Sequence, residues 1–65
     1  MLKESKDLIE KIEKKRKEKG LSINRFAIKE LGVSVPAYKR WVSGEIEPLP
    51  SSQYLLSSYL KNDND

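Results

Sequence analysis

The sequence predicts an all-α fold, a small four- to five-helix bundle that forms a single domain over residues 1–65. Apolar residues recur at intervals of three and four along most of the chain, and this period indicates amphipathic helices. Serines precede several of these stretches and glycines follow them, at Ser5, Ser22, Ser34, Gly20, Gly32 and Gly44. Serine is favoured at the N-cap of a helix and glycine just beyond its C-terminus, so these residues predict the helix boundaries.

The composition indicates a thin hydrophobic core beneath a strongly charged surface. Hydrophobic residues make up 37% of the chain and charged residues 35%. A chain of this length buries only about 60% of its unfolded surface, so we expect marginal stability. The sequence contains no Cys and no His, which excludes a disulfide framework and a Cys/His zinc site. We expect no metal, no cofactor, no small-molecule substrate and no enzymatic activity, because so small a helical bundle offers little pocket volume.

The apolar runs are short, and residues 1–8 contain no apolar signal segment. A membrane-spanning helix needs about 20 predominantly apolar residues. We therefore expect no membrane span and a cytoplasmic location.

The charges are distributed unevenly along the chain. Residues 1–44 contain twelve Lys and Arg against six Asp and Glu, a net charge of +6, whereas residues 45–65 contain one against four, a net charge of −3. A positive field of this kind attracts a polyanion and speeds its encounter. A solvated, lysine-rich helix explains the same charges equally well.

The first helix is expected to run from Ser5, as its N-cap, to Lys19. Its apolar stripe consists of Leu8, Ile9 and Ile12. Glu13 and Lys17 lie four residues apart, a spacing that favours an ion pair on a helix surface. The last turn is strongly basic, which suits the helix dipole and also suits contact with phosphates.

Two shorter helices follow, joined by a tight turn at residues 31–34. The second is expected from Ser22 to about Leu31, with Phe26 and Ala27 in the core. The third begins after Ser34 and ends at Ser43.

Tyr38 and Trp41 are three residues apart on this third helix and should face inward together. Its other side carries Val35, Pro36, Lys39, Arg40 and Ser43. Two helices in this arrangement predict a helix-turn-helix at residues 22–43, whose second helix can lie in the major groove of DNA.

The segment 45–50 contains two prolines and is expected to be a loop, followed by a last helix from about Ser51 to Lys61. The apolar content of this helix is generous for one face, so part of it is expected outside the monomer core. The candidate residues for a dimer interface are Tyr54, Leu56, Tyr59 and Leu60. The alternative, that most of these side chains cap the monomer core, stays open. The polar tail at residues 62–65 is expected to be disordered.

The order and spacing of several residues resemble the Cro/CI-type (lambda repressor-like) helix-turn-helix family of phage and bacterial repressors. The residues that carry the resemblance, between about residues 8 and 60, are Gly20-Leu21-Ser22, Phe26-Ala27, Leu31-Gly32-Val33-Ser34, Tyr38, Trp41, Gly44, Pro48 and Leu60. The resemblance implies sequence-specific binding of double-stranded DNA, usually as a homodimer on a two-fold operator, for transcriptional control in a bacterial cytoplasm.

Three departures from the family pattern bear on mechanism. The interval from Ala27 to Gly32 is one residue longer than usual, so we expect the second helix to contain an extra residue or a looser end. Many relatives carry a glutamate at the position of Val42, paired with an arginine that corresponds to Arg16. We expect Arg16 to bond backbone carbonyls or a phosphate instead. The third helix opens with apolar residues, which cannot make the bidentate hydrogen bonds by which Gln or Asn read adenine.

Arg40 is therefore the expected direct reader, with two hydrogen bonds to guanine O6 and N7. Val35, Pro36 and Ala37 are expected against thymine methyl groups, and Lys39 against a base or a phosphate. The remaining candidate contacts, all to phosphates, are Arg16, Ser22, Asn24, Arg25 and Ser43.

Two other functions remain open from the sequence. The domain could be a protein-interaction module, such as a phage inhibitor or cofactor of a host protein, or an antitoxin, because apolar residues remain on the last helix and at the start of the third. A winged excisionase-type DNA-binding protein is the other alternative, although a wing needs two strands after the third helix.

Overall fold

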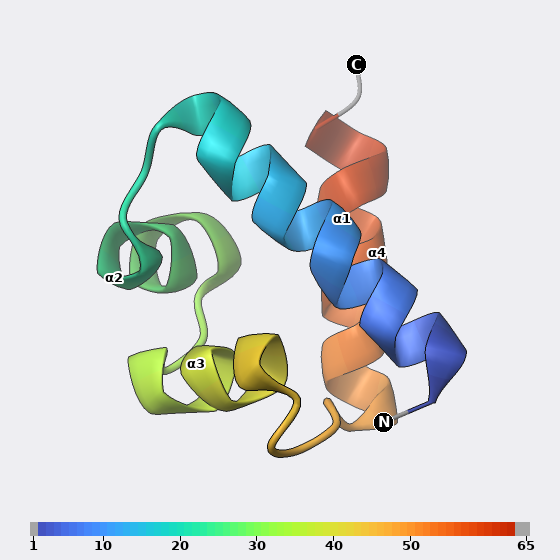
Figure 1. Ribbon diagram of the computed structural model, residues 1–65. Coiled ribbons are helices and arrows are strands. Elements are labelled where there is room, and N and C mark those ends of the chain that lie inside the picture. Colours follow the sequence, from blue (N-terminus) through green and yellow to red (C-terminus); the bar gives the residue numbers. More distant parts are fainter. Residues whose placement is uncertain (1, 64–65) are drawn as a thin grey trace.

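The computed structural model describes residues 2–63, and its helices confirm the predicted all-α class. The helices are α1 (Lys3–Lys19), α2 (Ile23–Arg25) with its direct continuation η1 (Phe26–Leu31), α3 (Val35–Ser43) and α4 (Pro50–Asp63). Figure 1 shows α1 crossing α4 on one side of the molecule, with α2 and α3 lying one above the other on the opposite side. No helix in the described part of the chain is both long and apolar enough to span a membrane.

The core joins all four helices around one aromatic side chain. The core cluster of buried residues consists of Ile9, Ile12, Phe26, Ala27, Leu31, Tyr38, Trp41 and Leu56. The ring centroid of Phe26 lies 5.9 Å from that of Tyr38 and 5.6 Å from that of Tyr59, the second pair edge-on at 90°. Tilted and edge-on rings are favoured arrangements of aromatic pairs, so Phe26 ties α3 and α4 to the second helix.

The N-cap of the first helix lies three residues earlier than the N-cap predicted from the sequence. Its N-cap is Leu2, whose side chain makes no capping bond. Ser5, predicted as the N-cap, lies inside the helix and is almost completely buried. A small hydroxyl side chain fits where α1 packs closely on the rest of the bundle, so burial outweighs the capping preference here.

The extra residue expected in the second helix is present, and it is accommodated by π-helical backbone. η1 covers Phe26–Leu31, and the N–H of Gly32 donates to the carbonyl of Ala27, five residues earlier. Phe26 and Ala27 at the start of the segment are buried, as is Leu31 at its end, whereas Ile28 between them is 57% exposed. The wider π turn therefore takes up one residue without moving the core residues on either side.

Deletion of Ile28 is expected to leave the protein folded, because it removes an exposed residue and lets the segment become a regular α-helix. The free energy of unfolding should fall by no more than about 0.5 kcal/mol, as for changes away from the core. Thermal melts measure the change in stability, and amide NMR spectra show whether the fold is kept. Deletion of Lys11, between the buried Ile9 and Ile12 of α1, is the matched control and should unfold the protein. Unfolding by both deletions to the same extent would contradict this account of η1.

Most of the residues of α4 that the sequence suggested for a dimer interface pack against the core of the monomer instead. Leu56 is completely buried, so its assignment to a dimer interface is wrong. Leu60 packs partly buried against the core, and so does Tyr59, whose hydroxyl donates to Glu30 at 2.9 Å. Tyr54 is the exception, at 77% exposed.

Helical backbone also extends further along the chain than predicted. α4 continues to Asp63, so the tail predicted to be disordered begins inside a helix, and residues 64–65 lie outside the described residues. The winged alternative required two strands after α3, and the segment is helical from Pro50 instead.

Candidate nucleic-acid interface

Both ends of α3 are fixed by residues that the sequence marks as helix boundaries. The Ser34 hydroxyl accepts a hydrogen bond from the Ala37 N–H at 3.4 Å, and Pro36 occupies the first turn, where a missing N–H costs little. At the other end Gly44 has φ 83°, a left-handed conformation that disfavours side chains with a Cβ. Its N–H donates to the carbonyls of Arg40 and Trp41, which ends the helix at Ser43.

The two faces of α3 have opposite character. Tyr38 and Trp41 are buried and pack edge-on, with ring centroids 6.3 Å apart, which confirms their predicted inward position. Four residues at the spacing i, i+3, i+4 and i+7 are exposed and form the outward stripe of α3, namely Pro36, Lys39, Arg40 and Ser43. Val35 and Ala37, also predicted to face outward, are only partly exposed because they pack against the core cluster.

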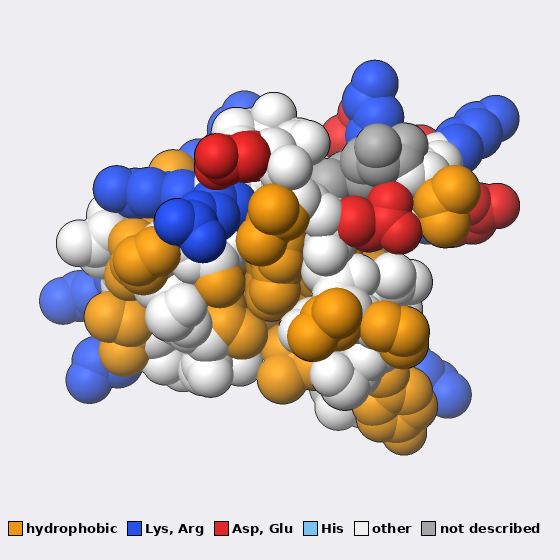
Figure 2. All heavy atoms as spheres, turned by 90° about the horizontal axis from the view of Figure 1, so that it is seen from below, with side chains coloured by type: hydrophobic (Ala, Val, Ile, Leu, Met, Phe, Trp, Pro, Cys, Tyr) orange, Lys and Arg blue, Asp and Glu red, His pale blue; other side chains and the backbone are white. Residues whose placement is uncertain are grey.

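The outward stripe is positively charged. Lys39 and Arg40 are exposed side by side, and the stripe itself contains no acid. Arg40 makes one surface ion pair, with its Nε 3.7 Å from Oε2 of Glu45. Figure 2 shows this end of the molecule from below, with Lys and Arg side chains gathered on the left around hydrophobic side chains.

Ser43 has a local role at the end of α3. Its hydroxyl donates to the Arg40 carbonyl at 3.1 Å and accepts from the Glu45 N–H at 3.3 Å. Both bonds add to the backbone bond from the Glu45 N–H to the Arg40 carbonyl, so the hydroxyl is held close to the turn that ends α3.

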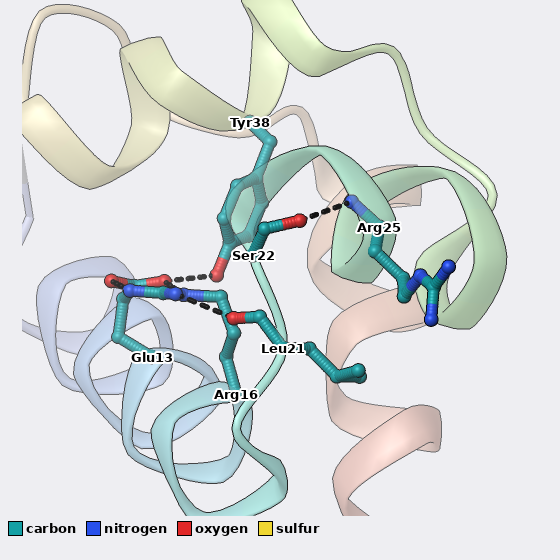
Figure 3. A network of polar contacts seen from close by, with 6 residues as sticks. All are labelled: Glu13, Arg16, Leu21, Ser22, Arg25 and Tyr38. Atoms are coloured by element: carbon teal, nitrogen blue, oxygen red, sulfur yellow. Dashed lines mark hydrogen bonds and ion pairs between the residues drawn. The ribbon is translucent and has the colours of Figure 1, made fainter.

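The start of α2 presents a second polar group beside α3. The Ser22 hydroxyl is the N-cap and accepts from the Arg25 N–H at 3.1 Å. Asn24 and Arg25 are exposed on the first turn, and Figure 3 shows the Arg25 guanidinium directed away from the other labelled side chains. An N-terminal turn with free N–H groups and an exposed cation is a common contact for phosphate.

Arg16 is held in a network that joins α1 to α3, which Figure 3 shows at close range. Its Nε and Nη2 donate to the two carboxylate oxygens of Glu13 at 2.8 and 3.0 Å, and its Nη1 donates to the Leu21 carbonyl at 2.8 Å. The Tyr38 hydroxyl donates to the same carboxylate at 2.5 Å. The side chains of Arg16 and Glu13 are only 16% and 15% exposed.

The network shifts the ionisation of its members in the directions expected for a partly buried cluster. Hydrogen bonding from Arg16 lowers the pKa of Glu13 below its usual value, although burial opposes the shift, and Tyr38 and the charge of Lys17 add to it. Burial raises the pKa of Tyr38 well above its usual value, and the neighbouring Glu13 adds to this effect. The carboxylate is therefore ionised and the phenol neutral around neutral pH.

This network changes the expected partner of Arg16 and confirms that Arg16 bonds a backbone carbonyl. The glutamate that the resemblance implies at the position of Val42 is missing, and Arg16 pairs instead with Glu13, three residues earlier on its own helix. Its bond to the Leu21 carbonyl is one of the two outcomes expected from the sequence. All three guanidinium nitrogens donate within the protein, so Arg16 does not join the exposed cations of α2 and α3. The signal for this partnership was the i,i+3 spacing of Glu13 and Arg16, which competed with Lys17 at i,i+4.

Comparison with known families matches residues 12–63 to a family described as helix-turn-helix. The matched region covers most of the chain and includes α2, α3 and the turn between them. No curated protein and no solved structure matches the chain. The capped α3, its basic outward stripe and this match lead to one conclusion: the chain belongs to the Cro/CI-type family of DNA-binding helix-turn-helix regulators.

Proposed function

We propose that the protein is a sequence-specific transcriptional repressor of phage or bacterial origin that places α3 in the major groove of double-stranded DNA. The outward stripe of α3 carries this proposal, because two adjacent cations stand there on a helix whose other face is anchored by buried aromatic rings. A rigidly anchored helix with exposed cations fits the width of the major groove.

Each part of this surface suits a different contact. Arg40 is the proposed reader of guanine, Pro36 is the most exposed apolar group available to a thymine methyl, and Lys39 reaches a base or a phosphate. Val35 and Ala37 add only the part of their surface that their packing against the core leaves exposed. Ser22, Asn24 and Arg25 are the proposed phosphate contacts at the start of α2.

The test is binding to the duplex upstream of the protein's own gene, compared with a scrambled duplex of equal length at about 150 mM salt. Sequence-specific binders prefer their site by roughly a thousandfold or more over non-specific DNA. A reporter gene behind the same upstream region should be expressed less when the protein is present. Equal, weak binding to both duplexes would contradict the proposal.

We also propose that the protein acts on DNA as a homodimer, through the exposed apolar surface at the start of α4. Leu49, Tyr54 and Leu55 are exposed there, close together in sequence around the first turns of the helix. A single headpiece makes few base contacts, and a two-fold dimer doubles them on a palindromic site.

Tyr54→Lys is expected to weaken dimerisation and lower DNA affinity at least about tenfold, because it places charge in an apolar contact and removes the second headpiece. Analytical ultracentrifugation and DNA titration measure the two effects. The matched control is Lys61→Ala, a change of an exposed residue near the other end of α4. A Tyr54→Lys protein with the mass and DNA affinity of the wild type would remove this interface.

The same apolar surface also supports a second candidate function, that of a protein-interaction module. Large apolar side chains exposed together often mark a protein contact. Purification from the host distinguishes the two functions: DNA that comes with the protein supports the regulator, and a stoichiometric protein partner supports the module.

A further inference from the structure

The backbone of Glu45 is fixed at the end of α3, next to the proposed reader of guanine. Its N–H donates to the Arg40 carbonyl at 3.0 Å and to the Ser43 hydroxyl at 3.3 Å. Gly44 makes this turn with its left-handed conformation. The carboxylate is therefore delivered to the side of α3 that carries Arg40.

The side chains of Glu45 and Arg40 form an ion pair. A contribution to folding stability does not explain why this pair lies here. Nε of Arg40 lies 3.7 Å from Oε2 of Glu45, with side chains 58% and 67% exposed. Exposed pairs of this kind contribute little to folding. An acid just beyond a helix C-terminus also interacts unfavourably with the helix dipole.

Glu45 also differs from the other acid near the helix-turn-helix in the residue with which it pairs. Residues 22–43 contain one acid, Glu30, which bonds Lys19 and the Tyr59 hydroxyl. The next acid in the chain is Glu45, and it lies against Arg40 rather than against a cation elsewhere.

A carboxylate beside a DNA-reading arginine affects its two classes of partner differently. A phosphate that approaches Arg40 brings a negative charge close to the negative charge of Glu45, and the two repel. Guanine offers O6 and N7, which are acceptors without a formal charge, in a geometry that fits the guanidinium fork. The carboxylate therefore penalises a phosphate contact by Arg40 more than a guanine contact.

We propose that Glu45 is a specificity-determining residue, which pairs with Arg40 in the free protein and disfavours phosphate contacts by this arginine. This inference rests on the proposed DNA-binding function. Specificity is a ratio of affinities, and a group that weakens binding to wrong sites raises the ratio as effectively as a new contact to the right site.

The test is Glu45→Gln, which removes the charge and keeps the size of the side chain. We expect its affinity for a random-sequence duplex to rise about fivefold, the upper range for one exposed ion pair. Its affinity for a duplex selected by the wild-type protein should change less than about twofold. The dependence of log K on log salt for the random duplex should steepen by about 0.9, the increment for one more phosphate contact.

Two variants control this experiment. Glu4→Gln makes the same change of net charge at an exposed residue in the first turn of α1, and it should alter both affinities equally and slightly. Glu45→Gln in an Arg40→Ala background should have no selective effect, because the proposed role acts through Arg40. Circular dichroism checks that each variant is folded.

An equal rise in affinity for both duplexes would overturn the proposal, since net charge would then explain the effect. A loss of affinity for the selected duplex alone would also overturn it and make Glu45 a direct reader, because carboxylates accept hydrogen bonds from cytosine N4. If the wild-type protein selects no sequence from a random pool, the proposed function fails together with this role. If it selects one and the ratio is unchanged in Glu45→Gln, only the role of Glu45 fails.

Discussion

Replacing Glu13 with alanine is expected to lower the free energy of unfolding by about 3 kcal/mol, because a mostly buried arginine and a buried phenol both lose the carboxylate that they share. Glu13 accepts from Arg16 on α1 and from Tyr38 on α3. A domain of this size is stabilised by only about 3–10 kcal/mol in total. A thermal or urea melt followed by circular dichroism measures the loss, which corresponds to a drop in Tm of roughly 15 °C.

The matched control is Glu10→Ala, the loss of an exposed carboxylate three residues earlier on the same helix. It should change stability by less than about 0.5 kcal/mol. Similar losses for the two variants would mean that the network does not stabilise the junction of α1 and α3.

The contribution of Glu13 should also depend on pH in a defined direction. The folded protein holds the pKa of Glu13 below its ordinary value of 4.5. The unfolded chain therefore takes up a proton first as the pH falls, so the stabilisation is fully present above pH 4.5 and is lost as the pH falls through the folded pKa. The difference in stability between the wild type and Glu13→Ala should accordingly narrow in acid.

Replacing Arg40 with alanine is expected to reduce affinity for a duplex selected by the wild-type protein by roughly 10- to 100-fold, the effect of one bidentate guanine contact. The preference should relax at one base pair of the site. Folding should be almost unaffected, because the side chain is largely exposed and its only ion pair in the described part of the chain is the weak one with Glu45. A fluorescence titration with the selected duplex and its single-base variants measures both effects.

Lys39→Ala is the matched comparison, a neighbouring cation on the same stripe. A phosphate contact by Lys39 predicts weaker binding to every duplex and a salt dependence reduced by about one unit. Uniform weakening by Arg40→Ala as well, with no change of base preference, would assign both residues to the DNA backbone.

The helix ends and the buried face of α3 can be predicted from the sequence, because the capping preferences and the core packing agree at these positions. Ser22 and Ser34 each cap the helix that follows, and Gly32 and Gly44 have the left-handed conformation that ends a helix. Tyr38 and Trp41 fall on the buried face that their spacing predicts.

The expectations that failed concern contacts made between distant parts of the chain. Ser5 has a good capping side chain, but the packing of α1 buries it within the helix. Leu56 is one of several apolar residues on α4, and only the tertiary arrangement decides which of them enters the core. Spacing alone also cannot choose between Arg16 and Lys17 as the partner of Glu13, and it does not reveal that Tyr38 of α3 donates to the same carboxylate.

The extra residue between Ala27 and Gly32 is an intermediate case. The sequence predicts that the second helix contains one more residue, but it does not predict the form of the backbone that accommodates it. The answer follows from what lies on either side, where buried residues fix both ends of η1 and leave the exposed middle free to widen.

We propose above all that the outward stripe of α3 reads double-stranded DNA. The most direct test of this claim is selection of bound duplexes from a random-sequence pool by the wild-type protein, followed by sequencing. We expect an enriched motif that contains a guanine whose enrichment is lost when Arg40→Ala is used in the selection. A pool that stays random after several rounds, or a motif that is unchanged by Arg40→Ala, would contradict the claim.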